Sequence, residues 1–285
     1  MLRPLKLRIQ RAPQPAGPTA SDLPVASVWV DSGIATLTEP FSYLIPEKLS
    51  SQIKIGSRVQ VPFKDKQLEG IIIDRTPLPT DSKELKSIYK LLGDFPVATQ
   101  ETIELISLSA NFWGGSPYDV IRSAIPPRVA SAEKGLAFTP ALTRSNAEAT
   151  ATFHLLPPKV DPVTALSHLI ATQKSVGARL VIVPTVRELN RLTDLLVQAD
   201  IAFTSLDSNL PRADRYRNFL SVSLGGPKLV IGMRGAVFAP IPNLTDIFLH
   251  QESSEHYFER RTPYWNAREV AWMRSKLSRV NLHLT

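Results

Sequence analysis

The chain has 285 residues, with 33 lysines and arginines against 26 aspartates and glutamates, and a formal net charge of +7. It contains no cysteine, which excludes disulfides, thiolate nucleophiles and cysteine zinc sites. Its 43% hydrophobic content suits a globular protein with a buried core, and no stretch approaches the ~18 apolar residues of a membrane helix. The basic balance favours polyanionic partners, with solubility alone as the plain alternative.

The first third of the chain has a tail followed by short β patterns. Residues 1–24 are basic and rich in Pro and Ala, lack the apolar core of a signal peptide, and are expected to be disordered. Prolines there argue against an amphipathic transit peptide. Short strands separated by Gly, Pro and Asp then predict a small barrel or sandwich. The predicted strands are Val25–Val30, Phe41–Ile45, Arg58–Val61 and Leu68–Ile73.

Two helices are predicted next. Thr99 is a suitable N-cap for a helix that ends near Trp113, and Ser116 caps a second helix that ends before Pro126. Together with the strands they complete a predicted domain over 25–128. Residues 129–150 are rich in Ala, Ser and Thr without periodicity, which indicates a linker.

Residues 151–285 show strands that alternate with helices. Thr185 is the expected cap of a helix with leucines along one side, and a further helix is predicted from Pro211 to about Leu220. This alternation predicts a parallel sheet with helices on both faces. The predicted strands are Arg179–Val183, Ile201–Leu206, Lys228–Gly232 and Thr245–Leu249.

Several segments of the first domain resemble a known family. PFSYLIP at 40–46, GSRVQVPF at 56–63 and the pair Leu85-Lys86 are similar to the N-terminal 3′-DNA-end-binding domain of PriA. PriA is the family of replication-restart helicases also called primosomal protein N′. The stretch from Ser109 to Pro127 resembles the helical close of the same domain. A mixed fold follows from the resemblance, with a small β-barrel-like DNA-binding domain before an α/β lobe.

A second block supports that α/β lobe. LVIGMRGAVFAP at 229–240 resembles the PriA segment before the helicase DEEH box, and NARE at 266–269 resembles the segment after it. The resemblance therefore implies a RecA-like, P-loop-type lobe over 151–285. The linker leaves no room for the family's winged helix, and the family's second lobe and zinc sites have no counterpart in this sequence.

The resemblance also implies a set of DNA-binding residues. Phe41, Ser42, Lys64 and Lys86 fall on or beside the positions with which the family holds a 3′ end. Ser42 stands where the family has an aspartate, so it keeps a hydroxyl but loses the charge-assisted acceptor. General DNA binding is expected, with specific capture of the end weakened. For Tyr43, ordinary packing in the barrel is the preferred interpretation.

The nucleotide loop departs from the family pattern. A phosphate loop needs consecutive glycines for its backbone N–H groups, a lysine for the β and γ oxygens, and a hydroxyl for Mg²⁺. The matching segment is 155–162, which contains no glycine. Asp161 and Pro162 take the lysine and hydroxyl positions, beside Pro158 and Lys159. Prolines remove N–H donors and the aspartate repels phosphate, so tight ATP binding is not expected.

The acidic box departs as well. DEEH aligns with His250, Gln251, Glu252 and Ser253. Neutral imidazole is a poor ligand for Mg²⁺, and glutamine cannot act as a general base. We therefore expect a degenerate lobe without catalytic residues, which holds neither the family's ATP and Mg²⁺ nor its zinc.

Other polar residues allow alternatives. A zinc site is a minor alternative for the acidic and histidine cluster, because its spacing matches no helix-face pattern. His154 and His168 are interpreted as isolated structural or surface histidines. The cluster comprises His250, Glu252, Glu255 and His256.

Several arginines have two interpretations. Arg260 and Arg261, close to Tyr257, Tyr264 and Trp265, either contact nucleic acid or accompany aromatics that pack on the sheet. Arg58 lies between alternating apolar residues and is expected to point to solvent or DNA. For Arg234 and Arg268 we expect a structural salt bridge or a vestigial site role.

The leading hypothesis is a cytoplasmic, nucleoid-associated PriA-like protein that binds forked or single-stranded DNA and other primosome proteins without hydrolysing ATP. An active ATP-dependent 3′–5′ helicase with an atypical nucleotide site is the alternative. A protein-binding adaptor without DNA contact is a third possibility, against which the basic balance argues. No membrane association is expected.

Overall fold

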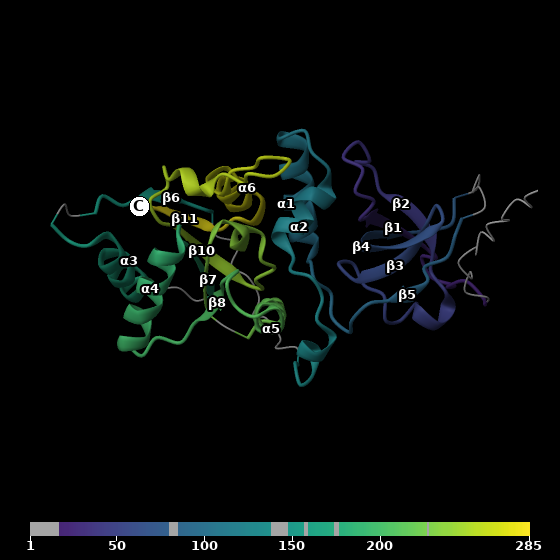
Figure 1. Ribbon diagram of the computed structural model, residues 1–285, viewed down its shortest axis with the longest axis horizontal. Coiled ribbons are helices and arrows are strands. Elements are labelled where there is room, and N and C mark those ends of the chain that lie inside the picture. The colour runs from purple at the N-terminus through teal and green to yellow at the C-terminus, as the bar shows by residue number, and fades with distance from the viewer. Residues whose placement is uncertain (1–16, 80–84, 138–147, 157–158, 174–176, 227) are drawn as a thin grey trace, which may run out of the picture. The chain divides into compact units, whose positions relative to one another are not determined.

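The structure is a computed structural model and describes residues 17–79, 85–137, 148–156, 159–173, 177–226 and 228–285. The chain divides into two compact units, residues 1–96 and residues 97–285. Each unit is built around its own sheet (Figure 1). The first sheet is antiparallel and the second is parallel, so the predicted mixed fold class is confirmed.

The first unit contains a five-stranded sheet in the order β2-β1-β4-β3-β5. β1 pairs with both β2 and β4, with a register shift between Ser27 and Val28 against β4. The four predicted strands are all present, and β5 is an addition. The strands are β1 (Val25–Val30), β2 (Phe41–Leu44), β3 (Arg58–Phe63), β4 (Lys66–Thr76) and β5 (Lys90–Leu91).

The segment that leads into β5 closes this sheet into a barrel. The Leu44 amide donates to the Lys86 carbonyl at 2.9 Å, and the Ile88 amide donates to the Leu44 carbonyl at 2.9 Å. Two residues later the same segment pairs with β3, where the Tyr89 amide donates to the Gln60 carbonyl. One short segment thus joins both edges of the sheet. Closure leaves few free strand edges, which is how small antiparallel folds avoid edge-to-edge association.

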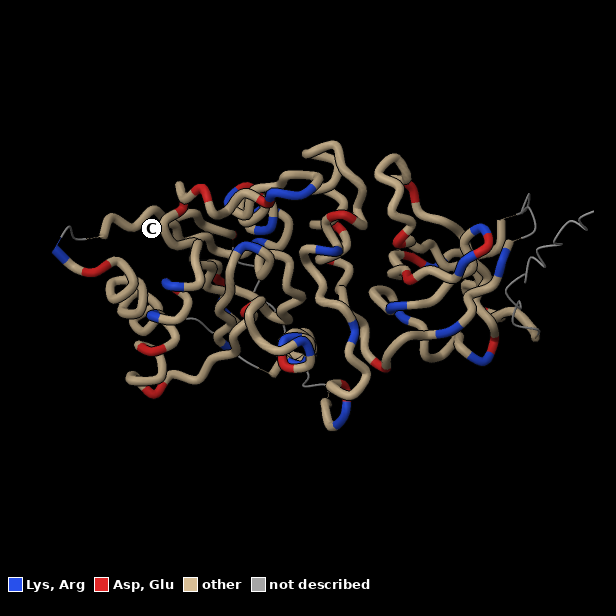
Figure 2. Tube along the Cα trace, in the orientation of Figure 1, with Lys and Arg blue, Asp and Glu red and all other residues tan. Residues whose placement is uncertain are grey.

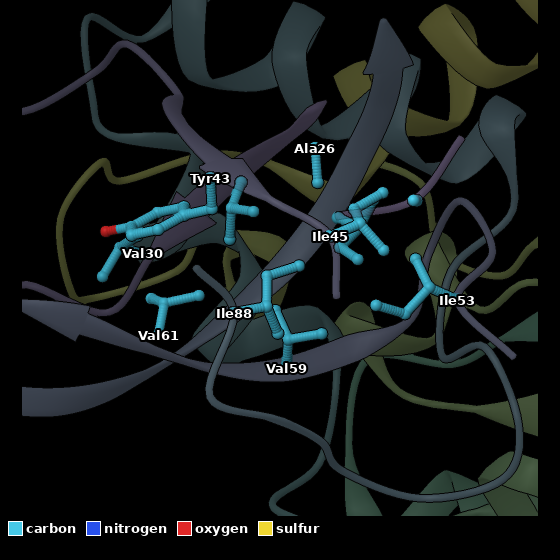
Figure 3. Packing of buried hydrophobic residues seen from close by; sticks show 11 residues of the cluster. Ala26, Val30, Tyr43, Ile45, Ile53, Val59, Val61 and Ile88 are labelled. Carbon is cyan, nitrogen blue, oxygen red and sulfur yellow. The ribbon is translucent and has the colours of Figure 1, made fainter. Parts of the chain in front are cut away.

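The core of the barrel is made by the inward-facing residues of its strands, shown in Figure 3. Alternation along β2 places Tyr43 inside, at 4% exposure, while Ser42 faces outward. Aliphatic side chains fill most of the remaining interior. The labelled members of this core are Ala26, Val30, Tyr43, Ile45, Ile53, Val59, Val61 and Ile88.

The end of the expected disordered tail is ordered, which corrects the prediction for residues 17–24. The Ala20 amide donates to the Ile45 carbonyl at 2.8 Å, and the Ala20 side chain is buried. Arg75 at the end of β4 fixes the same segment, because its guanidinium donates to the carbonyls of Asp22 and Leu23. It also donates to backbone carbonyls of the loop at 50–53. A single side chain therefore binds two loops that composition alone did not connect.

The second unit contains a six-stranded sheet in the order β6-β11-β10-β7-β9-β8, in which every pairing is parallel. The predicted strands correspond to β7 to β10, whereas β6 and β11 were not predicted. The strands are β6 (Ala151–Phe153), β7 (Ala178–Ile182), β8 (Thr204–Leu206), β9 (Leu229–Gly232), β10 (Leu244–Leu249) and β11 (Asn281–Leu284).

Helices lie on both sides of this sheet, as predicted (Figure 1). α3 (Pro162–Thr172) and α4 (Val186–Gln198) form a core with strand residues such as Val181 and Phe248. α6 (Ala267–Ser278) packs on β10 and β11, and α5 (Arg212–Ser223) packs beside β8. The predicted cap of α4 is a full capping box between Thr185 and Glu188.

The helices α1 (Gln100–Phe112) and α2 (Pro117–Ala124) belong to the second unit. This division differs from the predicted domain end at 128. Arg274 of α6 provides the physical reason, because its guanidinium donates to the carbonyls of Val237 and Ala239 and pairs with Glu101 of α1 at 3.5 Å. Arg274 is 2% exposed, so these contacts lie inside the packed interface between helices.

The beginning of the predicted linker is also folded. Residues Ala130–Glu133 form the short 3-10 helix η2. Arg128 binds the Glu133 carboxylate through two nitrogens at 2.8 Å each, and the Tyr216 hydroxyl lies 3.1 Å from the same carboxylate. Part of the linker, 138–147, lies outside the described residues. In the described part of the chain, no helix is both long and apolar enough to cross a membrane.

Candidate functional sites

The start of β2 brings together two of the predicted DNA-binding residues. The rings of Phe41 and Phe63 meet edge to face, with centroids 5.2 Å apart. Lys64 follows in the turn between β3 and β4, with φ +52°, and its Nζ lies 5.9 Å from the Phe63 ring centroid. Phe41 is half-buried and Lys64 is exposed. The arrangement places a cation next to an aromatic pair at one end of the barrel.

The other two predicted residues are exposed, Ser42 on β2 and Lys86 on the segment that bonds to β2. Ser42 is exposed, because it alternates with the inward-facing Phe41 and Tyr43. Lys86 is also exposed, and its carbonyl accepts the amide of Leu44, two residues after Ser42. Among the described residues, neither Lys64 nor Lys86 forms an ion pair within 4.0 Å. These lysines therefore remain available to an anionic ligand.

Two neighbouring side chains of the barrel are structural. Tyr43 is buried and its hydroxyl donates to the Pro62 carbonyl at 3.2 Å, while burial raises the pKa of this phenol to about 12. Arg58 is 5% exposed and pairs with Glu69 across the β3–β4 ladder at 3.2 Å. The expectation that Arg58 points to solvent or DNA is wrong, because the adjacent strand supplies a carboxylate within reach.

The loop before α3 ends in an internal cap. Asp161 is the N-cap, and its carboxylate accepts from the Thr164 amide and hydroxyl, both at 2.9 Å. Arg191 of α4 lies 2.8 Å from the same carboxylate. The hydrogen bond from the Thr164 amide, together with Arg191, lowers the pKa of Asp161. Pro162 begins the helix without an N–H and Lys159 is exposed, while Pro158 lies outside the described residues.

The residues aligned with the acidic box are held by the protein itself. His250 follows β10 and is fully buried, with Nδ1 2.7 Å from the Thr285 hydroxyl. Desolvation lowers the pKa of His250, against the opposing charges of Glu188 and Asp161. Gln251 is exposed at φ +49°, and Glu252 pairs with Arg268 at 2.8 Å.

His250 Nε2 is buried and has no hydrogen-bond partner among the described residues. A neutral imidazole at that place accepts or donates only one further bond, and a charged one is disfavoured by burial. Tyr257 lies beside His250, since its hydroxyl is within hydrogen-bonding distance of the Ile182 and His250 carbonyls. Burial first, and the nearby carboxylates second, raise the pKa of Tyr257.

The loop that follows separates buried from exposed aromatics. Tyr257 and Trp265 are fully buried, whereas Tyr264 is 61% exposed. Arg260 is exposed and the Arg261 side chain is 85% exposed. Packing therefore accounts for Tyr257 and Trp265, which are buried. Tyr264, Arg260 and Arg261 are exposed and remain accessible to a ligand.

The remaining polar predictions have mixed outcomes. Arg234 pairs with Glu259 at 3.3 Å, which agrees with a structural salt bridge. No group of three or more histidine or acidic residues in the described segments could hold a metal ion. His168 is exposed as expected. His154 is not isolated, because its Nε2 lies 3.0 Å from Nδ1 of His283, whose Nε2 lies 3.1 Å from buried Asp246.

A basic pocket was missed by the sequence interpretation. It encloses about 260 Å³ where β7, β8 and β9 end, within the second unit. Four arginines line it, from α2, α5, the turn after β9 and the loop after β10. Figure 2 shows basic and acidic positions gathered along α5. Only the rule that ligands bind at the carboxyl ends of parallel strands pointed to this place. The arginines are Arg122, Arg215, Arg234 and Arg261.

Comparison with known proteins agrees with the barrel geometry. Residues 27–126 match the PriA family profile described as 3′DNA-binding domain (3′BD). The chain is 29% identical over 271 residues to the probable replication restart protein PriA of Mycobacterium tuberculosis strain H37Rv, covering 85% of this chain and 41% of that protein. It is 26% identical over 268 residues to replication restart protein PriA of Rickettsia conorii, covering 86% and 40%.

A solved structure, the Escherichia coli DExH-box NTPase HrpB, superposes with a TM-score of 0.33 at 15% identity, covering 48% of this chain and 19% of that one. The matched region and the barrel define a protein with a 3′ DNA-binding domain. More particularly, the chain is similar to replication restart protein PriA, and it spans about two fifths of the length of the relatives named above.

Proposed function

We propose that this protein acts in replication restart by binding forked or single-stranded DNA through its barrel. The observation that carries the proposal is the match of residues 27–126 to the PriA 3′ DNA-binding domain. The geometry supports it, since Phe41, Ser42, Lys64 and Lys86 surround the start of β2 and its neighbouring segment. Lysines contribute phosphate contacts, and the half-buried Phe41 offers apolar surface beside them, neither of which requires a particular base.

Serine in place of the family's aspartate defines the expected mode of binding. A neutral hydroxyl forms a weaker hydrogen bond to a terminal ribose than a carboxylate does. The protein therefore binds DNA mainly through phosphates, with little preference for a free 3′ hydroxyl. A Ser42→Asp variant restores the acceptor and is expected to raise the preference for a 3′-hydroxyl end over a 3′-phosphate end.

Filter binding of the full chain to forked DNA tests this half of the proposal. Tight binding at low salt that weakens as salt rises is expected, because lysine–phosphate contacts release counterions. Lys86→Ala should weaken binding and reduce the salt slope by about 1. Lys48→Ala, at an exposed lysine of the short helix η1 (Glu47–Leu49), is the matched control and should change little. Absence of binding at low salt would refute the proposal.

The second half of the proposed function is that the protein does not hydrolyse ATP. Support comes from Asp161, whose carboxylate already occupies the N-terminal donors of α3 where a phosphate would have to lie. His250 and Gln251 also lack the carboxylates with which a helicase holds Mg²⁺ and activates water. Two carboxylates described at this edge, those of Asp161 and Glu252, are each paired with an arginine, Arg191 and Arg268.

Two measurements address ATP. DNA-stimulated phosphate release should not exceed a buffer blank, and a fluorescent ATP analogue should show no saturable binding in the micromolar range. An active 3′–5′ helicase with an atypical nucleotide site is the alternative function, and micromolar ATP affinity with DNA-dependent turnover would favour it. A Walker-type helicase serves as the positive control in both assays.

We propose further that the protein works in the cytoplasm, at the nucleoid, with other primosome proteins. The support is the family match alone. Pull-down with the tagged protein as bait, in the presence of forked DNA, distinguishes this role from that of an adaptor without DNA contact. In the proposed role, recovery of other restart proteins depends on DNA binding and is reduced in the Lys86→Ala variant. Recovery that persists when DNA is digested would favour the adaptor.

A further inference from the structure

The arginine-lined pocket of the second unit has the composition of a ligand site. Its walls come from separate elements, with Ser123 on α2, Ser208 after β8 and Gly235 in the turn after β9. The carboxyl ends of parallel strands form its base, at Pro184 after β7 and Leu206 at the end of β8. Open parallel sheets commonly bind ligands at this edge, because the strand ends and the following loops leave a crevice there.

Glycine keeps two walls of the pocket close together. A Cβ added at Gly235 would lie 3.0 Å from the Ser123 carbonyl oxygen, which is tighter than ordinary contact. The five-residue 3-10 helix η3 (Arg234–Phe238) therefore approaches α2 only because this residue has no side chain. The close approach sets Arg122 on one wall against Arg234 on the other.

The charges of the pocket are unbalanced. Four guanidinium groups line it against the single carboxylate of Glu259. That carboxylate is shared, since its oxygens lie 3.3 Å from Arg234 and 3.9 Å from Arg261. Arg122 has a partner outside the lining residues, Asp119, at 2.8 Å. The excess of positive charge favours an anion, because several guanidinium groups line one place.

Arg215 is the side chain that points most directly to a missing ligand. It is half-buried in the first turns of α5, yet its guanidinium forms no hydrogen bond or ion pair with any residue that the structure describes. A guanidinium has five N–H donors, and the described residues use none of those of Arg215, which leaves them to water or to a ligand. Neighbouring Arg212 on the same helix is exposed and does not line the pocket.

We infer that this pocket binds a phosphomonoester, the terminal phosphate of a nucleotide or of a nucleic-acid strand. A terminal phosphate carries close to two negative charges near neutral pH and three acceptor oxygens, which suits several convergent guanidiniums. A phosphodiester within a strand carries one charge and continues on both sides. The enclosed 260 Å³ is small for a ligand site and fits one end group. The two sources of this chemistry are a free nucleotide and a 5′-phosphorylated DNA end.

The experiment uses the full chain and two pairs of probes that differ only in the phosphate. AMP is compared with adenosine by calorimetry, and a short 5′-phosphorylated oligothymidylate is compared with its 5′-hydroxyl form by fluorescence anisotropy. In each pair, the phosphorylated member is expected to bind at least about tenfold more tightly if it is the natural source. AMP binding identifies a free nucleotide, and a preference found only with the oligonucleotide identifies a DNA end.

Variants locate the effect in the pocket. Arg215→Gln is expected to abolish the preference for the phosphate, whereas Arg212→Gln, on the same helix, should retain it. Arg261→Gln should weaken it without disturbing the fold, because that side chain is 85% exposed. Circular dichroism checks that each variant is folded. Equal binding within both probe pairs, a preference that survives Arg215→Gln, or an equal loss in Arg212→Gln would overturn the assignment.

This inference is independent of DNA binding by the barrel. The calorimetric comparison of AMP with adenosine contains no DNA, and forked DNA with 5′-hydroxyl ends tests the barrel without supplying a phosphomonoester. A protein that binds such forks but shows no phosphate preference would retain the proposed function and lose the pocket assignment. A protein that shows the phosphate preference but does not bind such forks would retain the pocket assignment and lose the proposed function.

Discussion

The start of β2 in the barrel and the carboxyl edge of the six-stranded sheet both hold polar residues that the sequence singled out. At the barrel, Ser42, Lys64 and Lys86 are exposed. At the sheet edge, Asp161 is bonded to Thr164 and Arg191, and Glu252 is paired with Arg268. The polar groups of the first region are open to a ligand, while those of the second are largely satisfied by the protein.

This difference distinguishes polar groups that a ligand can reach from polar groups that already bond to one another. A helix N-terminus that has its own carboxylate cap offers fewer donors to a phosphate and places a negative charge beside it. Exposed lysines on a barrel, by contrast, cost little in the unbound state because water solvates them. We expect substitutions at the sheet edge to change stability and substitutions at the barrel face to change DNA affinity.

The largest expected effect tests the internal bonding of the second unit. Arg274→Ala removes a fully buried guanidinium and leaves the Val237 and Ala239 carbonyls without their donor. We expect a loss of about 2–4 kcal/mol in the free energy of unfolding. Urea denaturation followed by tryptophan fluorescence measures it. Lys276→Ala on the same helix is exposed and should change stability by less than about 0.5 kcal/mol.

Substitutions on the barrel face should change DNA affinity and leave stability unchanged. Reversing charge in a Lys64→Glu, Lys86→Glu double variant is expected to weaken DNA binding by about 10- to 100-fold at low salt, because two phosphate contacts become repulsive. Stability should be unchanged within about 0.5 kcal/mol. Filter binding and urea denaturation on the same samples give both quantities. A variant that loses stability but keeps its DNA affinity would reverse the comparison.

The cap of α3 gives a smaller effect that depends on pH. Asp161→Ala should destabilise the second unit at neutral pH, because it removes the N-cap of α3. Because the pKa of Asp161 is lowered from 3.8 in the folded state, its stabilisation is present above that value and is lost as pH falls through the folded pKa. Asp161→Asn keeps a capping oxygen without the titration, so its stability should not follow that acid-dependent loss. Denaturation midpoints between neutral and acid pH decide this.

The smallest expected effect concerns Tyr43 inside the barrel. Tyr43→Phe removes the hydroxyl that donates to the Pro62 carbonyl and should cost about 0.5–1.5 kcal/mol. The pKa of Tyr43 is raised from 10.0 to about 12, so the neutral phenol stabilises the fold below pH 10 and this contribution is lost as pH rises toward 12. Ultraviolet titration should show a late-titrating tyrosine that disappears in the variant. An unchanged titration curve would mean that Tyr43 is not the buried phenol.

Much of the fold could be predicted because local patterns agree with it. The alternation in Arg58–Val61 and the cap at Thr185 each specify an element without reference to the rest of the chain. β6 and β11 were missed, since they have three and four residues and are held by each other and by β10. Strands this short depend on their neighbours more than on their own sequence.

The sites were predictable only where residues lie close together in the sequence or match a family. Phe41 and Ser42 fall in one recognisable segment. Arg58 was misplaced because its partner, Glu69, is on another strand. The contact of His154 with His283 spans 129 residues, and the pocket of Arg215 is assembled from several loops. Such contacts follow from the three-dimensional arrangement and leave no signal in spacing or composition.

The packing of α1 and α2 has a practical consequence for dissecting the protein. The family match ends at residue 126, and a fragment cut there would keep both helices while losing α6, which holds Glu101 through Arg274. Apolar surface on those helices would then face water, inviting aggregation. A fragment that ends at Pro96 retains the whole barrel and does not contain α1 and α2, which belong to the second unit. A recombinant barrel fragment should therefore end thirty residues before the domain boundary that sequence similarity suggests.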